Sequence, residues 1–162
     1  MKLIFFIAGM LFVYSINAQS KKDLVTNKIL SETTTVTATV DGKEVTCKDT
    51  YTLYDKDGKV IEETEYSKDG NIKKKTVNKF DSQKNKIEES VYEVKTKAIT
   101  KTTYTYNASN DKIGEIEYDA NGNIEKQSVY TYDKKGFKID KKTYDGNKKL
   151  LSVKKYTYTN RK

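Results

Sequence analysis

The sequence predicts an all-β fold, an antiparallel up-and-down meander of about 9–10 strands built from 26-residue double-hairpin repeats. Three observations predict it. Aromatic residues recur at alternating gaps of 12 and 14 residues. Each begins a segment that is typical of a turn, and stretches rich in Thr, Tyr and Val lie between these segments. No stretch of useful length has helical periodicity; only residues 23–30 suit a short helix or an arm.

The repeats extend over most of the chain. The recurring aromatic positions are Tyr54, Tyr66, Phe80, Tyr92, Tyr106, Tyr118, Tyr132, Tyr144 and Tyr158. A column of isoleucines keeps the same 26-residue phase, at Ile61, Ile87, Ile113 and Ile139. Such agreement indicates a repeat domain in which each unit packs mainly against its neighbours.

The turns have a consistent chemistry. In residues 118–122 (Tyr-Asp-Ala-Asn-Gly), Asp119 can bond to its own backbone, and Gly122 can adopt a positive φ. We expect this turn to place Tyr118 opposite Ile124 across a hairpin. Residues 55–58 (Asp-Lys-Asp-Gly) have a partial likeness to a calcium loop, but the further oxygen ligands at fixed offsets are missing. We interpret them as a turn and expect neither a metal site nor a cofactor.

The even spacing also predicts how the side chains divide between the faces. If no bulge intervenes, all nine aromatic positions lie on one face, interleaved with Lys and Thr. A thinner aliphatic face lies behind it, at odd positions such as Ile99 and Val129. The pattern leaves open which face is buried, and whether the sheet is open and twisted or closed into a barrel.

Residues 1–18 have the plan of a cleaved secretory signal peptide. Lys2 is followed by an apolar run over residues 3–14, and Ala18 precedes Gln19 as a small residue at the cleavage point. A membrane span needs about 20 apolar residues, so we expect no membrane span. The product would be secreted or held in the periplasm or at the cell surface. Residues 19–32 then form an N-terminal arm, and residues 33–162 form a single β-repeat domain.

The composition argues against several functions. The 162 residues include no His and one Cys, which excludes histidine-based catalytic triads, histidine-ligated metals and an internal disulfide. The net charge of +8 comes from Lys scattered among Asp and Glu, with Arg161 as the single Arg, a pattern that argues against nucleic-acid binding. Adjacent carboxylates such as Glu62 and Glu63 point to opposite faces of a strand. An enzyme working through carboxylates alone is therefore the weakest alternative.

The turns resemble those of the YD-repeat (RHS-like) proteins, whose units centre on Tyr-Asp-x-x-Gly followed by an aliphatic residue. The matching segments are residues 54–58, 118–122 and 132–136. The resemblance implies a β-rich repeat architecture and a carbohydrate-binding role for the repeats. This chain is shorter than the large members of that family, has a doubled period and lacks the Arg that commonly follows their glycine.

The tyrosines carry the functional prediction, because a row of rings with polar tips suits sugar rings or the surface of a partner. The candidate ligand-binding residues are Tyr104, Tyr106, Tyr130, Tyr132 and Lys126. We expect Tyr104 and Tyr130 to be the most available to a ligand. If they are buried, ligand binding lies on the loops at residues 67–70, 93–97 and 119–122, or the tyrosines serve only as the core of the repeat domain.

Two function classes remain open. The first is a non-catalytic secreted or surface-associated module that binds carbohydrate or another surface protein. The second is a purely structural or assembly protein without a small-molecule ligand. The sequence leaves the oligomeric state open.

Overall fold

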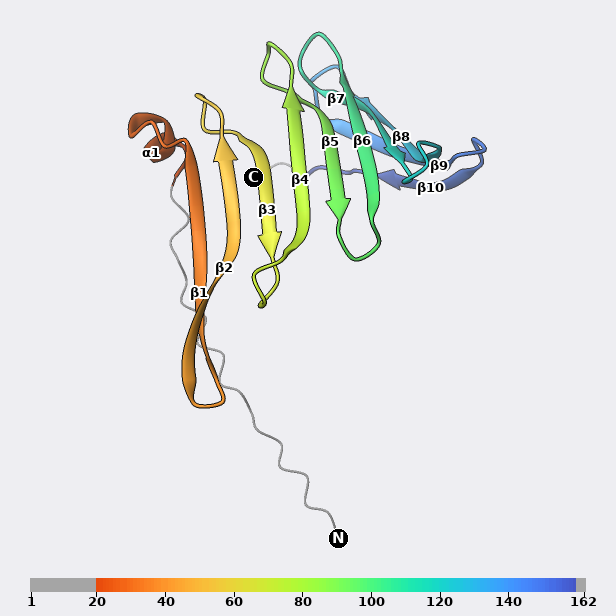
Figure 1. The fold of residues 1–162 in the computed structure, drawn as a ribbon. Coiled ribbons are helices and arrows are strands. Elements are labelled where there is room, and N and C mark those ends of the chain that lie inside the picture. Colours follow the sequence, from red (N-terminus) through yellow and green to blue (C-terminus); the bar gives the residue numbers. More distant parts are fainter. Residues whose placement is uncertain (1–19, 160–162) are drawn as a thin grey trace.

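The fold is described by a computed structural model over residues 20–159. Within these residues the chain forms one short helix and ten strands: α1 (Lys21–Thr26), β1 (Ser31–Val40), β2 (Lys43–Tyr54), β3 (Val60–Tyr66), β4 (Ile72–Phe80), β5 (Lys86–Glu93), β6 (Ala98–Tyr106), β7 (Lys112–Tyr118), β8 (Ile124–Tyr132), β9 (Lys138–Asp145) and β10 (Leu150–Lys155). The strands form one antiparallel sheet in sequence order (Figure 1). The predicted meander is confirmed.

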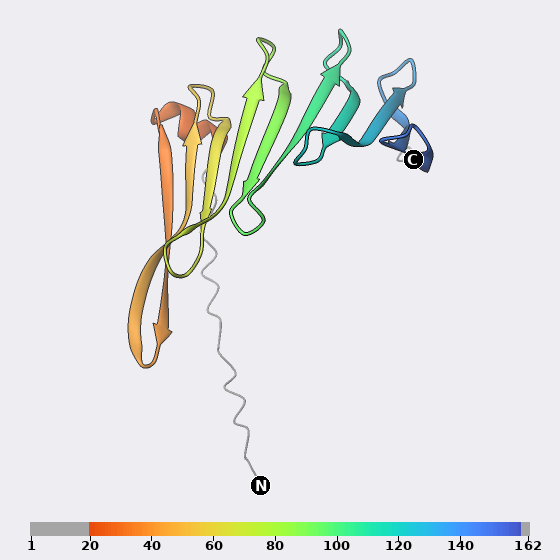
Figure 2. The same ribbon diagram turned by 45° about the vertical axis from the view of Figure 1, so that its right-hand side comes forward.

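The sheet is open and twisted. Strands β1 and β10 are its two edges, and the direction of the strands changes markedly from β1 to β10 (Figures 1 and 2). Strand β3 pairs with β2 only at residues 50–54, so the outer parts of β1 and β2 pair with each other alone. This outer hairpin extends past the rest of the sheet (Figure 2).

The turns have the predicted chemistry. The Asp119 Oδ1 accepts hydrogen bonds from the backbone N–H groups of Asn121 (2.9 Å) and Asn123 (2.8 Å), and Gly122 has a φ of +82°. Tyr118 pairs with Ile124, as expected. Asp55 accepts the same two backbone bonds in its own turn. Residues 55–58 therefore form a turn, and residues 20–159 contain no group of three or more acidic or thiol side chains placed to hold a metal ion.

The prediction that all nine aromatic positions share one face is wrong. Most hairpins contain a register shift beside the turn, as between Leu53, which pairs with Glu62, and Tyr54, which pairs with Val60. The residue skipped in this hairpin is Ile61, and Ile87, Ile113 and Ile139 are skipped in the equivalent hairpins. After an inserted residue, the odd-numbered and even-numbered positions exchange faces in the following strand. The aromatic positions therefore alternate between faces along the sheet.

The register defines two faces, since directly opposed residues share a face. The tyrosine face includes Thr52, Tyr54, Tyr104, Tyr106, Glu115, Lys126, Ser128, Tyr130, Tyr132 and Lys141. The aliphatic face includes Val77, Ile99, Ile116, Val129 and Val153, together with Tyr66, Tyr92, Tyr118 and Tyr144.

The tyrosine face holds most of the small buried core. Of the buried residues among those described, Thr52, Tyr54, Ser128 and Tyr130 lie on it, whereas Thr64 lies on the aliphatic face. The aliphatic face is open to solvent: Ile99 is 57% exposed and Val153 is 43% exposed. Residues 20–159 thus form a single-layer sheet stabilised mainly from its polar, aromatic side.

The N-terminal arm covers one corner of the sheet. Helix α1 begins at the capping box formed by Ser20 and Asp23, in which each side chain bonds the other residue's backbone. Leu24 is buried, and Val25 approaches Gly58 in the turn between β2 and β3. Strand β1 begins at Ser31, slightly before the expected boundary at residue 33.

Residues 1–18, which carry the predicted signal peptide, lie outside the described residues. In the part of the chain from 20 to 159, no helix has the length and apolar character needed to cross a membrane.

Candidate functional site: the tyrosine face

All five predicted site residues lie on the tyrosine face. Tyr104 and Tyr106 come from β6, whereas Lys126, Tyr130 and Tyr132 come from β8. The skipped residues do not separate them. One residue is skipped between β6 and β7 and another between β7 and β8, so even-numbered positions lie on the tyrosine face in both β6 and β8. The register therefore brings the predicted residues together on one side of the sheet.

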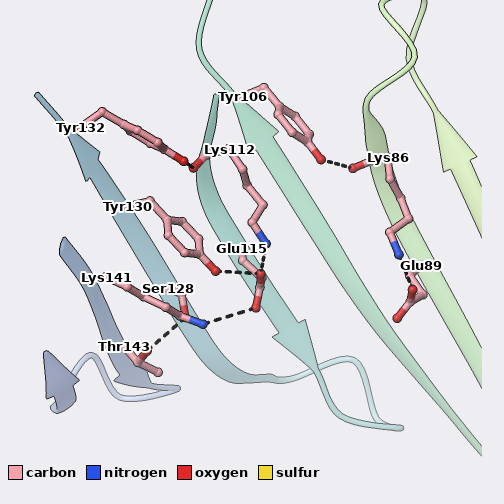
Figure 3. Close-up of polar contacts among 10 residues, drawn as sticks. All are labelled: Lys86, Glu89, Tyr106, Lys112, Glu115, Ser128, Tyr130, Tyr132, Lys141 and Thr143. Atoms are coloured by element: carbon pink, nitrogen blue, oxygen red, sulfur yellow. Dashed lines mark hydrogen bonds and ion pairs between the residues drawn. The ribbon is translucent and has the colours of Figure 1, made fainter. Parts of the chain in front are cut away.

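Repeated hydrogen bonds hold three of the tyrosine rings in place. The hydroxyls of Tyr106, Tyr132 and Tyr158 each donate to the backbone carbonyl of the lysine 20 residues earlier in the chain, at 2.8, 2.8 and 2.9 Å respectively. The acceptors are Lys86, Lys112 and Lys138, each one residue before a skipped isoleucine. Figure 3 shows the first two of these bonds. Each hydroxyl thus satisfies a backbone carbonyl beside a bulge, and this hydrogen bond fixes the position of the tyrosine ring.

One repeat makes the same contact with other residues. Phe80 stands at the equivalent aromatic position and has no hydroxyl. The Asn78 amide Nδ2 instead donates to the Val60 carbonyl at 3.1 Å. The carbonyl beside the bulge is thus bonded in this repeat as well, which supports a structural role for this contact.

Glu115 is the centre of a second set of contacts (Figure 3). Its carboxylate accepts a hydrogen bond from the Tyr130 hydroxyl at 2.9 Å, forms an ion pair with Lys112, and lies 3.9 Å from the Lys141 ammonium. Burial acts to raise the pKa of Glu115, but the hydrogen bonds from Lys112 and Tyr130 outweigh it and hold the pKa below its usual 4.5. The carboxylate is therefore charged at neutral pH.

Ammonium groups lie over the tyrosine rings. The Lys112 Nζ is 5.0 Å from the centroid of the Tyr104 ring and 4.9 Å from that of Tyr130. The Lys86 Nζ lies 5.4 Å from the Tyr104 centroid. These distances are typical of cation–π contacts. Burial and the nearby charges of Glu89 and Glu115 raise the pKa of Tyr104 to about 12, so its hydroxyl stays neutral.

The exposure of the two favoured tyrosines differs from the expectation. Tyr130 is only 6% exposed, so the prediction that it is freely available to a ligand is wrong. Its hydroxyl bonds to Glu115, and burial is the main cause of a raised Tyr130 pKa. Tyr104 is half-buried and lies beside a shallow depression that Asp81 and Ile87 also line. Tyr104 is therefore the better of the two contact residues.

Lys126 is held by two carboxylates. Its Nζ lies 3.5 Å from Glu117 across the hairpin and 3.4 Å from the adjacent Glu125. Those charges, that of Glu117 first, raise the pKa of Lys126. Its predicted role in ligand binding stays a prediction. The alternative loops are largely exposed, with Ser67 and Asp119 as their more covered members.

Sequence reasoning missed the residues that organise this face, namely Lys86, Glu89, Lys112 and Glu115. A signal for them was present. Lys86 and Lys112 are 26 residues apart, and each is followed three positions later by a Glu. Each pair forms an ion pair in the structure. The spacing of the aromatic and aliphatic positions alone does not reveal this column of charged residues.

Comparisons with known proteins leave the family open. No family model matches the sequence. No curated protein matches it either. The resemblance to YD repeats therefore stays a prediction.

Some solved structures have a limited likeness to the chain. TarM matches at 20% identity and a TM-score of 0.32, over 83% of this chain and 24% of TarM. A Staphylococcus aureus TarM mutant matches at 19% identity, with the same coverage and TM-score. A Bacteroides fragilis protein of unknown function matches at 13% identity and a TM-score of 0.23, over 81% of this chain and 96% of that protein. The chain spans about a quarter of the length of TarM, and these scores carry no functional argument.

Proposed function

We propose that the chain is a non-catalytic, secreted or cell-surface-associated module that binds a carbohydrate on its tyrosine face. The observation behind the proposal is a row of fixed tyrosine rings on a sheet face that no second layer covers within residues 20–159. Rings held in place lose little conformational freedom when a ligand packs on them. Tyr104, half-buried between two lysines, is the proposed central contact.

The polar groups between the rings favour a hydroxyl-rich ligand. The centres of protein–protein interfaces are depleted in Lys and Glu, whereas the tyrosine face carries Lys112, Glu115, Glu117 and Lys126 close together. Sugar hydroxyls can donate to these carboxylates and accept from these ammonium groups, while the apolar side of a sugar ring packs on tyrosine.

The two pairs of adjacent carboxylates, Glu62–Glu63 and Glu88–Glu89, support a non-catalytic role. Glu63 pairs with Thr76 on the tyrosine face, whereas Glu62 pairs with Val77 on the aliphatic face. Glu88 and Glu89 divide between the faces in the same way. Neither pair flanks a common position, as glycoside hydrolysis by two carboxylates requires.

A polysaccharide array tests the carbohydrate-binding proposal. Saturable binding to a glycan that is lost in Tyr104→Ala and kept in Tyr92→Ala is the expected result, since Tyr92 lies on the aliphatic face. Circular dichroism should show both variants folded. Binding that survives Tyr104→Ala, or no binding to any glycan on the array, contradicts the proposal.

A second candidate function, assembly with a protein partner, is favoured by the aliphatic face and by β1. Ile99 and Leu151 are 57% and 52% exposed. Strand β1 is an edge of ten residues with Glu32 as its one charged side chain, so it lacks the lysines that usually block edge pairing. Light scattering after size-exclusion chromatography distinguishes the two functions: assembly predicts oligomers that dissociate when Val36→Lys is introduced into β1.

The proposed location outside the cell has its own test. Mass spectrometry of the protein from its native host should find Gln19 as the first residue. An intact Met1 on the mature protein would contradict export by a cleaved signal.

A further inference from the structure

The charge on the tyrosine face changes sign in the last repeat. In three successive repeats a glutamate pairs across strands with a small hydroxyl residue: Glu63 with Thr76, Glu89 with Thr102 and Glu115 with Ser128. In the fourth repeat the same two positions are Lys141 and Lys154, which pair with each other. Like charges placed directly opposite on neighbouring strands repel each other. This end of the face therefore has two adjacent ammonium groups where the other repeats have one carboxylate.

Lys138 adds a third positive charge at the same place. It continues the column of Lys86 and Lys112, each of which forms an ion pair with the Glu three residues later. For Lys138 the residue three positions later is Lys141. Among residues 20–159, neither Lys138 nor Lys154 has a carboxylate within ion-pair distance, and Lys141 reaches only Glu115, at 3.9 Å. That carboxylate already pairs with Lys112 and Tyr130.

Tyrosine rings surround these three lysines. The Lys138 Nζ lies 4.8 Å from the Tyr130 centroid and 5.7 Å from the Tyr156 centroid. The Lys141 Nζ lies 5.3 Å from the Tyr130 centroid, and the Lys154 Nζ lies 5.4 Å from that of Tyr156. Lys138 and Lys141 are half-buried, and both ammonium groups lie over the Tyr130 ring. The rings orient the ammonium groups but leave their positive charges uncompensated.

We propose that Lys138, Lys141 and Lys154 form a binding site for the carboxylate or sulfate group of an acidic sugar, with the sugar ring against Tyr156. This inference rests on the proposed carbohydrate-binding function and names its ligand class. The anion relieves the repulsion between Lys141 and Lys154. A DNA duplex fits less well than a flexible acidic polysaccharide, because the stiff duplex cannot bend away from Glu63, Glu89 and Glu115, which follow along the same face.

The repeat itself supplies a conservative test variant. Lys141→Glu restores the residue that the other repeats carry at this position, next to a lysine that can pair with it, so the fold should tolerate it. Lys142→Glu makes the same change of charge one residue away, on the aliphatic face, where Lys142 pairs with Val129 and Val153. Any effect of net charge alone is the same in both variants.

The experiment measures binding of the full chain and both variants to polygalacturonate, its methyl ester, dextran sulfate, dextran and a short DNA duplex. We expect saturable binding to polygalacturonate or dextran sulfate, and the preferred polymer identifies carboxylate or sulfate. Lys141→Glu should weaken the binding of the acidic polymer about tenfold, and Lys142→Glu should weaken it less than about twofold. Equal weakening by both variants, or DNA bound as tightly as the acidic polymer, overturns the site.

Two further outcomes separate this inference from the proposed function. If the neutral polymers bind and the acidic ones do not bind better, the lysine site is wrong while carbohydrate binding stands. If none of the polysaccharides binds, and no glycan on the array binds, both are wrong.

Discussion

The two faces of the sheet reverse the usual arrangement of a soluble β protein. On β8, Tyr130 is 6% exposed on the tyrosine face, whereas the adjacent Val129 is 38% exposed on the aliphatic face. The polar and aromatic side chains bond to one another and to the backbone beside the bulges, while the aliphatic side chains remain in contact with solvent. Within residues 20–159, where the short N-terminal arm covers only one corner, a single layer can thus be stabilised by cross-strand contacts on one face, with a small contribution from the apolar face.

The largest expected effect comes from removing a ring from the tyrosine face. Tyr130→Ala should lower the free energy of unfolding by about 3 kcal/mol, since it leaves a cavity and deprives Glu115 of a donor. Tyr92→Ala, on the aliphatic face and 37% exposed, should cost about 1 kcal/mol or less. Urea denaturation measures both. Similar losses would show that the faces contribute equally.

The next effect concerns charge within the tyrosine face. Glu115→Gln should cost about 2 kcal/mol at pH 7, because the carboxylate pairs with Lys112 and accepts from Tyr130. Glu117→Gln, more exposed and paired with Lys126 at 3.5 Å, should cost about 0.5 kcal/mol or less.

The loss of stability caused by Glu115→Gln depends on pH, and the direction of this dependence follows from the pKa of Glu115. The folded-state pKa of Glu115 lies below its usual 4.5, so its contribution is full above that pH and is lost as the pH falls through the folded-state value. The difference between wild type and Glu115→Gln in urea should therefore shrink below about pH 4.5. A difference that grows in acid would contradict the assigned contacts.

A somewhat smaller effect tests the turn that establishes the faces. Gly122 has a φ of +82°, and a β-branched residue there is strained although no atom lies within 4 Å of an added Cβ. Gly122→Val should cost about 1–2 kcal/mol, and Ala120→Val, in the same exposed turn, much less. Equal melting temperatures for the two variants would argue against this turn geometry.

The smallest effect is spectroscopic. Burial and nearby carboxylates raise the pKa of Tyr104 to about 12, so its ionisation should follow that of ordinary tyrosines near pH 10. In an absorbance titration at about 295 nm, Tyr104→Phe should reduce the late phase by the amplitude of one tyrosine. Because the unfolded chain ionises first, stability should fall from about pH 10 upward. A late phase unchanged by Tyr104→Phe would place this side chain in solvent.

Spacing and turn chemistry were sufficient to predict the meander. Asp119 and Gly122 specify their turn by local bonds alone, and Tyr118 meets Ile124 as a consequence. The division of the faces was not predictable from spacing, because the skipped Ile113 looks like any other strand residue until the register is known. The same limit applies to the site. Tyr130 was identified, but its burial and its hydrogen bond to Glu115 at 2.9 Å follow from a register that the spacing does not reveal.

The central claim is that the tyrosine face, and not the aliphatic face, holds the sheet together. The most direct test replaces three aliphatic residues at once, Ile99→Thr, Val129→Thr and Val153→Thr, in side chains that are 57%, 38% and 43% exposed. Threonine keeps the β-branched shape that strands favour. The predicted loss in free energy of unfolding is about 1.5 kcal/mol or less for the three changes together, roughly half the loss from Tyr130→Ala alone. A triple variant that loses as much as Tyr130→Ala, or that fails to fold, would contradict the claim.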